Sequence, residues 1–210
     1  MSEHLRATTV AGALLDAGTV TLRPDQPVTF KSGLRSPVYV DNRRLIFQPA
    51  PWRVVIDAFA AELPDGQPVI AGVESAGIPH SSALAYAVGS PSVFVRKAAK
   101  EHGLARRIEG GDVGGRHTIL VEDMVTTGGS SLSAVEALRE AGAEVSRCLA
   151  IITYGFPEAF EAFEAAAVGL TTLTTFETVV AEALSRGTID ERQASLVRSW
   201  LADPHSWDDR

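Results

Sequence analysis

Residues 119–130 read ILVEDMVTTGGS. This stretch predicts a turn between a strand and a helix, because an apolar run leads into two acids, then into hydroxyls and glycines, and a helical pattern starts at Ser130 or Ser131. Unpaired backbone N–H groups at such a helix start carry the positive end of the helix dipole and can bind a phosphate. Glycines let the chain approach the phosphate, and hydroxyls add donors. The candidate phosphate-binding residues are Thr126, Thr127, Gly128, Gly129 and Ser130.

The two acids in this stretch, Glu122 and Asp123, would repel a phosphate but can accept hydrogen bonds from a neighbouring diol. A phosphorylated ribose presents both groups, so the stretch predicts a site for such a sugar. The alternative is a tight glycine turn with two capping acids, and a bare Gly-Gly pair would favour it. The complete order of strand, acid pair and hydroxyl-rich loop favours the binding site instead. The stretch is not a P-loop, since it lacks the Gly-Lys-Ser/Thr ending.

The chain on both sides of this turn alternates between short apolar runs and helical patterns. Short apolar strands separated by helices are typical of a parallel sheet, so the expected fold class is α/β. Residues 18–45 instead carry short alternating segments around prolines and predict a small β-rich hood. Residues 97–115, which are rich in glycine, predict a loop in which little is packed. Expected strands cover residues 69–73, 93–95, 118–121 and 145–153, and expected helical or amphipathic segments cover residues 5–17, 81–88, 130–142, 157–167, 178–185 and 189–201.

Length and charge restrict the function classes. With 210 residues, 45% hydrophobic content and no repeat or linker, the chain is expected to form one globular domain over residues 1–210. The net charge of −7 argues against a nucleic-acid or membrane-surface binder, which needs a basic face. Cys148, the single cysteine, excludes an internal disulfide and fits a buried position in a reducing, cytoplasmic protein. Neither a membrane span nor a secretory signal is expected.

The stretch 119–130 resembles the phosphoribosyl pyrophosphate signature of the type I phosphoribosyltransferases. The resemblance implies a Rossmann-like parallel sheet, flanked by helices, beneath a small and variable N-terminal hood. It also implies that the turn 126–130 holds the 5-phosphate of the ribose. Glu122 and Asp123 would contact the ribose hydroxyls, with Asp123 among the catalytic residues.

A second motif, residues 96–103, reads RKAAKEHG and places Arg96, Lys97, Lys100 and His102 close together in an acidic chain. A charge run of this kind is most often a solvated surface. The pattern nevertheless resembles the catalytic loop of the orotate phosphoribosyltransferases at all four of these positions. The resemblance implies that the loop closes over the site and reaches across a homodimer. Lys97 and Lys100 would stabilise the departing pyrophosphate as catalytic residues, and Arg96 and His102 would bind substrate.

The hood carries a third motif. Residues 31–41 read KSGLRSPVYVD and also resemble the orotate family. The resemblance implies that Lys31 and Tyr39 border the base and the pyrophosphate, where the lysine could pair with an anionic oxygen and the tyrosine could cover a flat ring. The alternative is a hairpin with an exposed lysine and a core tyrosine.

A fourth segment, residues 73–79, reads VESAGIP and matches the pyrophosphate-binding turn of the family in position. Ser75 and Ala76 are expected to bind through their backbone groups. The chain departs from the family pattern further on, because residues 153–154 are Thr-Tyr where many relatives have an Asp-Arg pair whose arginine holds the carboxylate of orotate.

Together the motifs imply a cytoplasmic, homodimeric enzyme that transfers the phosphoribosyl group of phosphoribosyl pyrophosphate to orotate in pyrimidine synthesis. The resemblance implies Mg²⁺ as the cofactor, bridging the pyrophosphate and the ribose hydroxyls, and no protein ligand for the metal is predicted. Two alternatives stay open. The first is a phosphoribosyltransferase for another base, and the second is a non-catalytic regulator that senses phosphoribosyl pyrophosphate.

Overall fold

The computed structural model describes residues 2–29, 35–98, 107–204 and 207. The chain divides into two compact units. The terminal unit combines residues Met1–Val54 with Thr174–Arg210, and the central unit consists of residues Val55–Leu173. Three predicted site residues, Lys31, Lys100 and His102, lie outside the described residues. The expectation of one domain over residues 1–210 stays a prediction.

The central unit is built on a six-stranded sheet with the order β10-β9-β8-β5-β6-β7. Its strands are β5 (Val69–Val73), β6 (Ser92–Val95), β7 (Ile108–Glu109), β8 (His117–Val125), β9 (Glu144–Thr153) and β10 (Gly169–Thr175). β5 pairs in parallel with β6 and with β8, and β8 pairs in parallel with β9, while the short β7 runs antiparallel to β6. The predicted α/β class with a parallel sheet is therefore confirmed.

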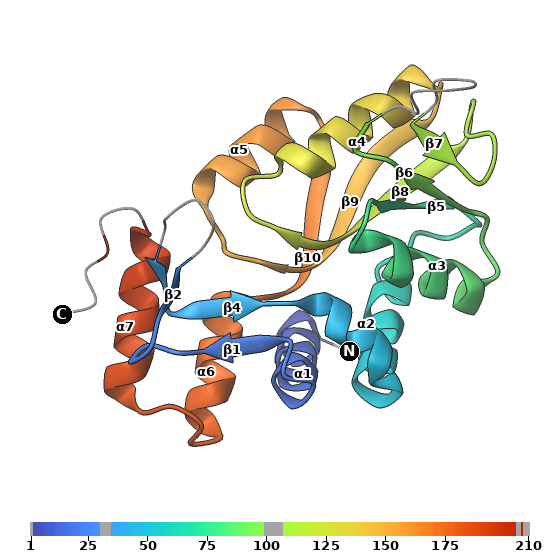
Figure 1. The fold of residues 1–210 in the computed structure, drawn as a ribbon. Coiled ribbons are helices and arrows are strands. Elements are labelled where there is room, and N and C mark those ends of the chain that lie inside the picture. Colours follow the sequence, from blue (N-terminus) through green and yellow to red (C-terminus); the bar gives the residue numbers. More distant parts are fainter. Residues whose placement is uncertain (1, 30–34, 99–106, 205–206, 208–210) are drawn as a thin grey trace. The chain divides into compact units, whose positions relative to one another are not determined.

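Helices cover both faces of this sheet, with α3 (Gly77–Val88) on one face and α4 (Gly129–Glu140) and α5 (Pro157–Ala165) on the other (Figure 1). Alternate residues of β5 explain the two layers, because successive side chains of a strand point to opposite faces. Val69, Ala71 and Val73 belong to the core that contains residues of α4 and α5. Gly72 faces α3, where an added Cβ would overlap with Oγ of Ser81. The missing side chain thus lets α3 pack close to the sheet.

The sheet differs from the prediction in three details. The predicted strand ends at residue 121, but β8 continues through both acids to Val125, because its pairing with β9 runs on to that residue. Helix α4 begins at Gly129, ahead of the predicted start at Ser130 or Ser131, and Gly128 is its N-cap. The described part of the predicted loop 97–115 contains β7, and Val113 is buried with 1% exposure. Most of its other described residues are exposed, so the expectation that little of this segment is packed holds except at β7 and Val113.

The terminal unit contains helices and two small antiparallel sheets. The helices are α1 (Glu3–Asp16), the first part of α2 (Pro49–Ala60), α6 (Phe176–Ser185) and α7 (Glu191–Ala202), together with the 3-10 helix η1 (Asn42–Phe47). One sheet pairs β1 (Val20–Leu22) with β4 (Val38–Val40), and the other pairs β2 (Val28–Thr29) with β3 (Arg35–Ser36). All four strands lie within residues 18–45, which agrees with the β-rich character predicted there. In the described part of the chain, no helix has the length and apolar character that crossing a membrane requires.

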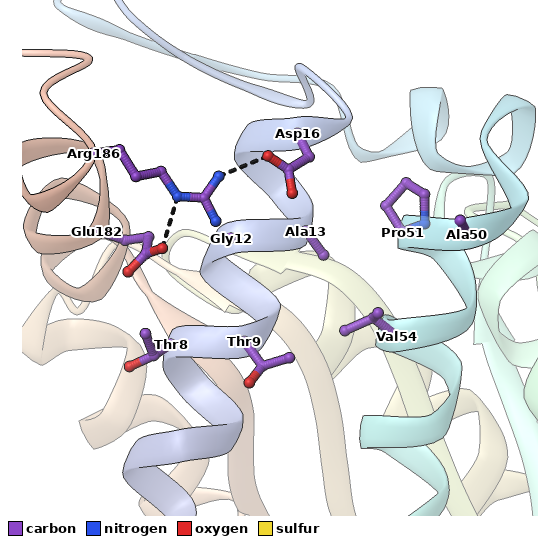
Figure 2. Close-up of a pocket in the computed structure, with 10 residues that line it drawn as sticks. All are labelled: Thr8, Thr9, Gly12, Ala13, Asp16, Ala50, Pro51, Val54, Glu182 and Arg186. Carbon is purple, nitrogen blue, oxygen red and sulfur yellow. Dashed lines mark hydrogen bonds and ion pairs between the residues drawn. The ribbon is translucent and has the colours of Figure 1, made fainter.

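An ion-pair clamp joins α1 to α6 (Figure 2). Arg186, the C-cap residue of α6, contacts Oδ1 of Asp16 through Nη1 at 2.6 Å and Oε1 of Glu182 through Nε at 2.7 Å. Gly12 makes room for the guanidinium, because a Cβ at that position would overlap with Nη2. These four residues border a cavity of about 540 Å³ between α1, α2 and α6, and the predicted site residues that the structure describes are not among its lining residues.

Candidate active site

The carboxyl ends of three neighbouring parallel strands, β6, β5 and β8, lie at one edge of the central sheet. The chain runs from β5 to β6 and then crosses to β8 on the other side of β5, so the strand order reverses between β5 and β8. Ligands of open α/β sheets bind outside the strand ends at such a switch point. The chain at these three strand ends carries the predicted site residues of the central unit that the structure describes.

The turn between β5 and α3 passes directly against β8. Gly77 permits this approach, because a Cβ at that position would lie 2.6 Å from the carbonyl oxygen of Val121. Ser75 is exposed and Ala76 is half-buried, and Ala76 is the N-cap of α3 without a side-chain cap bond. Backbone groups in this turn are therefore the means by which Ser75 and Ala76 could hold an anion.

The turn between β8 and α4 combines an exposed surface with a constrained backbone. Gly128 adopts a φ of +85°, in the left-handed region, and an added Cβ would lie 2.8 Å from the ring of Phe163. Its neighbours in the turn are exposed, namely Thr126, Thr127, Gly129 and Ser130. The start of α4 therefore presents hydroxyls and helix N–H groups outward, as a phosphate site requires.

Glu122 and Asp123 have different surroundings. They are consecutive residues of β8, so their side chains point to opposite faces of the sheet. Glu122 is 5% exposed and turns toward α4, where its Oε2 accepts a hydrogen bond from Oγ of Ser131 at 3.3 Å and lies 3.5 Å from Oγ of Ser130. Its Oε1 accepts from the N–H of Asp123 at 3.1 Å. Asp123 is half-buried, so it is the more accessible acid of the pair.

These surroundings favour the protonated form of Glu122. Burial, and then the charge of Asp123, raise the pKa of the Glu122 carboxyl from 4.5 to about 8. Burial also raises the pKa of the nearby Cys148 thiol, and the charge of Glu122 adds to that shift. The acid pair therefore carries less than two full negative charges at pH 7.

Cationic side chains lie beside the first turns of α4. Arg96 and Lys97 follow the end of β6, and the N–H of Lys97 donates to Oε2 of Glu74 at 2.8 Å. A cavity of about 210 Å³ is lined by Val73, Val95, Arg96, Lys97, Arg107, Ser130, Ser133 and Ala134. The structure thus brings the described part of the predicted cationic segment to the helix that begins at the glycine turn.

Residues near the end of β9 have structural roles. Thr153 is buried, and its Oγ1 donates to the carbonyl of Val125 at 3.0 Å and accepts from the N–H of Gly155 at 3.1 Å. Tyr154 stacks on Phe156 with ring centroids 5.3 Å apart, and burial raises the pKa of Tyr154 to about 12. The Thr-Tyr pair therefore closes the turn after β9.

Tyr39, on β4 of the terminal unit, is 42% exposed. The alternative that makes it a core residue is therefore wrong.

The sequence motifs missed three residues that connect the parts of this edge in the described structure: Glu74, Ser131 and Arg107. Glu74 receives the N–H of Lys97, Ser131 donates to Glu122, and Arg107 reaches both Arg96 and α4. The acid in the turn after β5 is a local signal for Glu74. The partners of Arg107 lie 11 and 26 residues away in the chain, so no local pattern predicts them.

Replacing Gly128 with alanine should lower the free energy of unfolding by about 1–3 kcal/mol, because alanine resists a positive φ and its methyl group would press on Phe163. Gly129→Ala is the matched control in the same turn, since no described atom lies within 4 Å of a Cβ added there. Urea unfolding of the two variants measures the difference. Equal stabilities would contradict the assigned role of Gly128.

Replacing Glu122 with glutamine should change how stability depends on pH. The folded protein keeps the Glu122 proton up to about pH 8, whereas an ordinary carboxyl group in the unfolded chain loses it near pH 4.5. The unfolded state therefore binds fewer protons in this window, and the wild-type free energy of unfolding falls as pH rises from about 4.5 to about 8. The glutamine side chain does not titrate, so the variant lacks this decrease in the free energy of unfolding.

The measurement is the Tm of both proteins from pH 5 to pH 8. The Tm of the glutamine variant, relative to that of the wild type, should increase as pH rises. His80 contributes the opposite trend, because burial lowers its pKa from 6.5 to about 4 and the unfolded chain alone is protonated between these values. That trend is common to both proteins and cancels in the difference. Parallel Tm profiles would contradict a protonated Glu122.

Comparison with known proteins identifies the family. Residues 53–165 match the phosphoribosyl transferase domain. The orotate phosphoribosyltransferase of Bacillus caldolyticus is 39% identical over 201 residues, which cover 94% of this chain and 97% of the relative. The crystal structure of orotate phosphoribosyltransferase from Aeropyrum pernix superposes with a TM-score of 0.73 at 28% identity and covers 86% of this chain and 99% of that chain.

A further solved structure is that of Mycobacterium tuberculosis orotate phosphoribosyltransferase in complex with phosphoribosyl pyrophosphate. It has a TM-score of 0.65 and 26% identity, and the match covers 82% of this chain and 98% of that chain. Sequence motifs, sheet topology and these similarities agree with one another. The chain therefore belongs to the orotate phosphoribosyltransferase family, within the type I phosphoribosyltransferases.

Proposed function

We propose that this protein transfers the phosphoribosyl group of phosphoribosyl pyrophosphate to orotate, and releases orotidine 5'-monophosphate and pyrophosphate. The observation that carries the proposal is the edge shared by β5, β6 and β8, where a helix start, an acid pair and cationic side chains come together. The helix start and the cations suit the phosphates of a sugar that is phosphorylated at both ends, and the acid pair suits its hydroxyl groups. The complex of the Mycobacterium tuberculosis relative with phosphoribosyl pyrophosphate supports the donor.

Each part of the phosphorylated sugar is bound by residues at the ends of these strands. The turn after β8 and the first N–H groups of α4 bind the 5-phosphate, with hydroxyl donors from Thr126, Thr127 and Ser130. Asp123 and Glu122 contact the ribose hydroxyls, and a protonated Glu122 can donate as well as accept a hydrogen bond. The backbone of the turn 74–77 binds the pyrophosphate.

The chemical step exchanges one bond at the anomeric carbon. A ring nitrogen of orotate attacks C1 of the ribose from the face opposite the pyrophosphate, and the proton on that nitrogen is released to solvent as the new bond forms. The bond between C1 and the pyrophosphate oxygen breaks, and that oxygen leaves with the bonding electrons. Lys97 and Lys100 stabilise the departing charge, with Arg96 and His102 as further binding residues. Positioning and electrostatics supply the catalysis, because the protein contributes no covalent nucleophile.

The proposal includes Mg²⁺, which the family of phosphoribosyl pyrophosphate enzymes implies. Mg²⁺ prefers oxygen ligands and is usually held by one or two carboxylates together with substrate phosphates. The carboxylate of Asp123 fits this preference, because it is half-buried and therefore more accessible than that of Glu122. The bound metal would neutralise charge on the pyrophosphate, while Asp123 would orient the ribose hydroxyls.

We further propose that the protein is a cytoplasmic homodimer in which the segment around Lys100 reaches the site of the partner. Lys31 and Tyr39 border the base and the pyrophosphate. These points rest on the family resemblance.

The wild-type protein, supplied with phosphoribosyl pyrophosphate and Mg²⁺, should convert orotate to orotidine 5'-monophosphate. The absorbance change of orotate measures the reaction. Uracil, adenine, guanine and hypoxanthine are tested separately as alternative substrates. Activity on a purine alone would overturn the proposed substrate. Binding of phosphoribosyl pyrophosphate without turnover of any base would instead support a regulator.

Replacing Lys100 with alanine should lower kcat about 10²–10³-fold with an unchanged Tm, because the lysine would act on charge that develops as pyrophosphate leaves. Arg116→Ala is the control, since Arg116 is an exposed cation beside the amino end of β8, away from the proposed site. That variant should keep wild-type kcat. Normal turnover in the Lys100 variant would refute the role of the cationic segment.

A further inference from the structure

We propose that Arg107 is a positioning residue that fixes Lys97 relative to α4, the helix of the proposed phosphate site. This inference rests on the proposed function and deepens it. Arg107 is half-buried at the cavity of about 210 Å³ that Lys97 also lines. Its contacts join two parts of the site that are far apart in the sequence.

The first contact closes the chain around the residue that precedes Lys97. The carbonyl of Arg107 accepts the N–H of Arg96 at 2.7 Å, which continues the antiparallel pairing of β6 with β7. Nε of Arg107 donates to the carbonyl of Arg96 at 2.9 Å. Both backbone groups of Arg96 are therefore bonded to the same arginine, and the direction in which the chain enters Lys97 is fixed.

The second contact reaches the helix. Nη1 of Arg107 donates to the carbonyl of Ser133 at 3.1 Å, in the second turn of α4. A planar guanidinium can serve both acceptors at once, because its donors have fixed directions. One side chain thus links the end of β6 to the helix that begins at the glycine turn.

A third contact completes the support of Lys97. Its own N–H donates to Oε2 of Glu74 at 2.8 Å, in the turn after β5. The backbone at Lys97 is therefore held between the turn after β5 on one side and the hydrogen bonds of Arg107 on the other. A cation that must meet departing pyrophosphate gains from such fixed geometry, because small displacements of a catalytic group lower the rate steeply.

The test compares kcat for Arg107→Ala, Arg107→Lys and the wild type with orotate and phosphoribosyl pyrophosphate. Arg107→Ala should lower kcat about tenfold or more. Arg107→Lys should stay close to the alanine variant, because an ammonium group keeps the charge but cannot reproduce the two-point fork. Wild-type kcat in the lysine variant would overturn the proposal, since charge alone would then be sufficient.

Arg139→Ala is the matched control for losing an arginine that is bonded to main-chain carbonyls. Arg139 lies in the last turn of α4, where Nη1 donates to the carbonyl of Ala166 at 2.8 Å and Nη2 to that of Val145 at 2.8 Å. Both alanine variants should lower Tm, but only Arg107→Ala should lower kcat. An equal loss of kcat in Arg139→Ala would overturn the proposal in favour of a general effect on α4.

A double-mutant cycle tests whether Arg107 acts through Lys97. If it does, adding Arg107→Ala to a Lys97→Ala variant should lower kcat less than about twofold further, because the coupled residue is already gone. Multiplied losses would overturn the proposal. The wild-type assay separates the two levels of inference. A wild type that forms no orotidine 5'-monophosphate refutes the proposed function, whereas an active wild type with a normal Arg107→Ala variant refutes the role of Arg107 alone.

Discussion

The parallel pairing of β5 with both β6 and β8 is the constraint on which the site depends. Strands that run in the same direction end at the same edge, so three turns that are separated in sequence meet there. An antiparallel neighbour would send one of these turns to the opposite edge. The site is thus first a consequence of strand direction, and only then of the residue types within each turn.

Two residues allow the turn after β5, strand β8 and the start of α4 to pack closely at this edge: Gly77, which has no side chain, and the buried Glu122. Gly77 lets the turn after β5 pass against the backbone of Val121, where a Cβ would lie 2.6 Å from the carbonyl oxygen. The carboxyl group of Glu122 lies at the same junction, 3.5 Å from where that Cβ would be, and contacts Ser131 on α4. Glu122 therefore connects the starts of α3 and α4, in addition to any contact with a ribose.

The parts of the fold that could be predicted are those that depend on local composition. The apolar run of β5 is fully buried, and its predicted bounds, residues 69–73, agree with the structure. The glycine turn before α4 could also be predicted, because glycines and hydroxyls next to a helix start are typical of a turn that can bind an anion.

Contacts between distant segments decide the rest. Acids are poor strand formers, yet β8 continues through Glu122 to Val125 because β9 offers partners along its whole length. Val113 is buried in a glycine-rich segment, and Arg107 is bonded to a helix carbonyl 26 residues away. Neither the burial of Val113 nor the contact of Arg107 can be predicted from the neighbouring sequence.

Burial also resolves an electrostatic conflict that the sequence alone presents. A chain with a net charge of −7 places two adjacent acids next to a turn that would bind a phosphate, and two full negative charges there would oppose the anion. The fold places Glu122 where burial and Asp123 raise its pKa to about 8, so that it is mostly neutral at pH 7. Arg96, Lys97 and Arg107 then line a cavity beside the same helix start. The local charge at this edge is therefore set by burial and long-range packing, and it differs from the charge that the acid pair would carry in water.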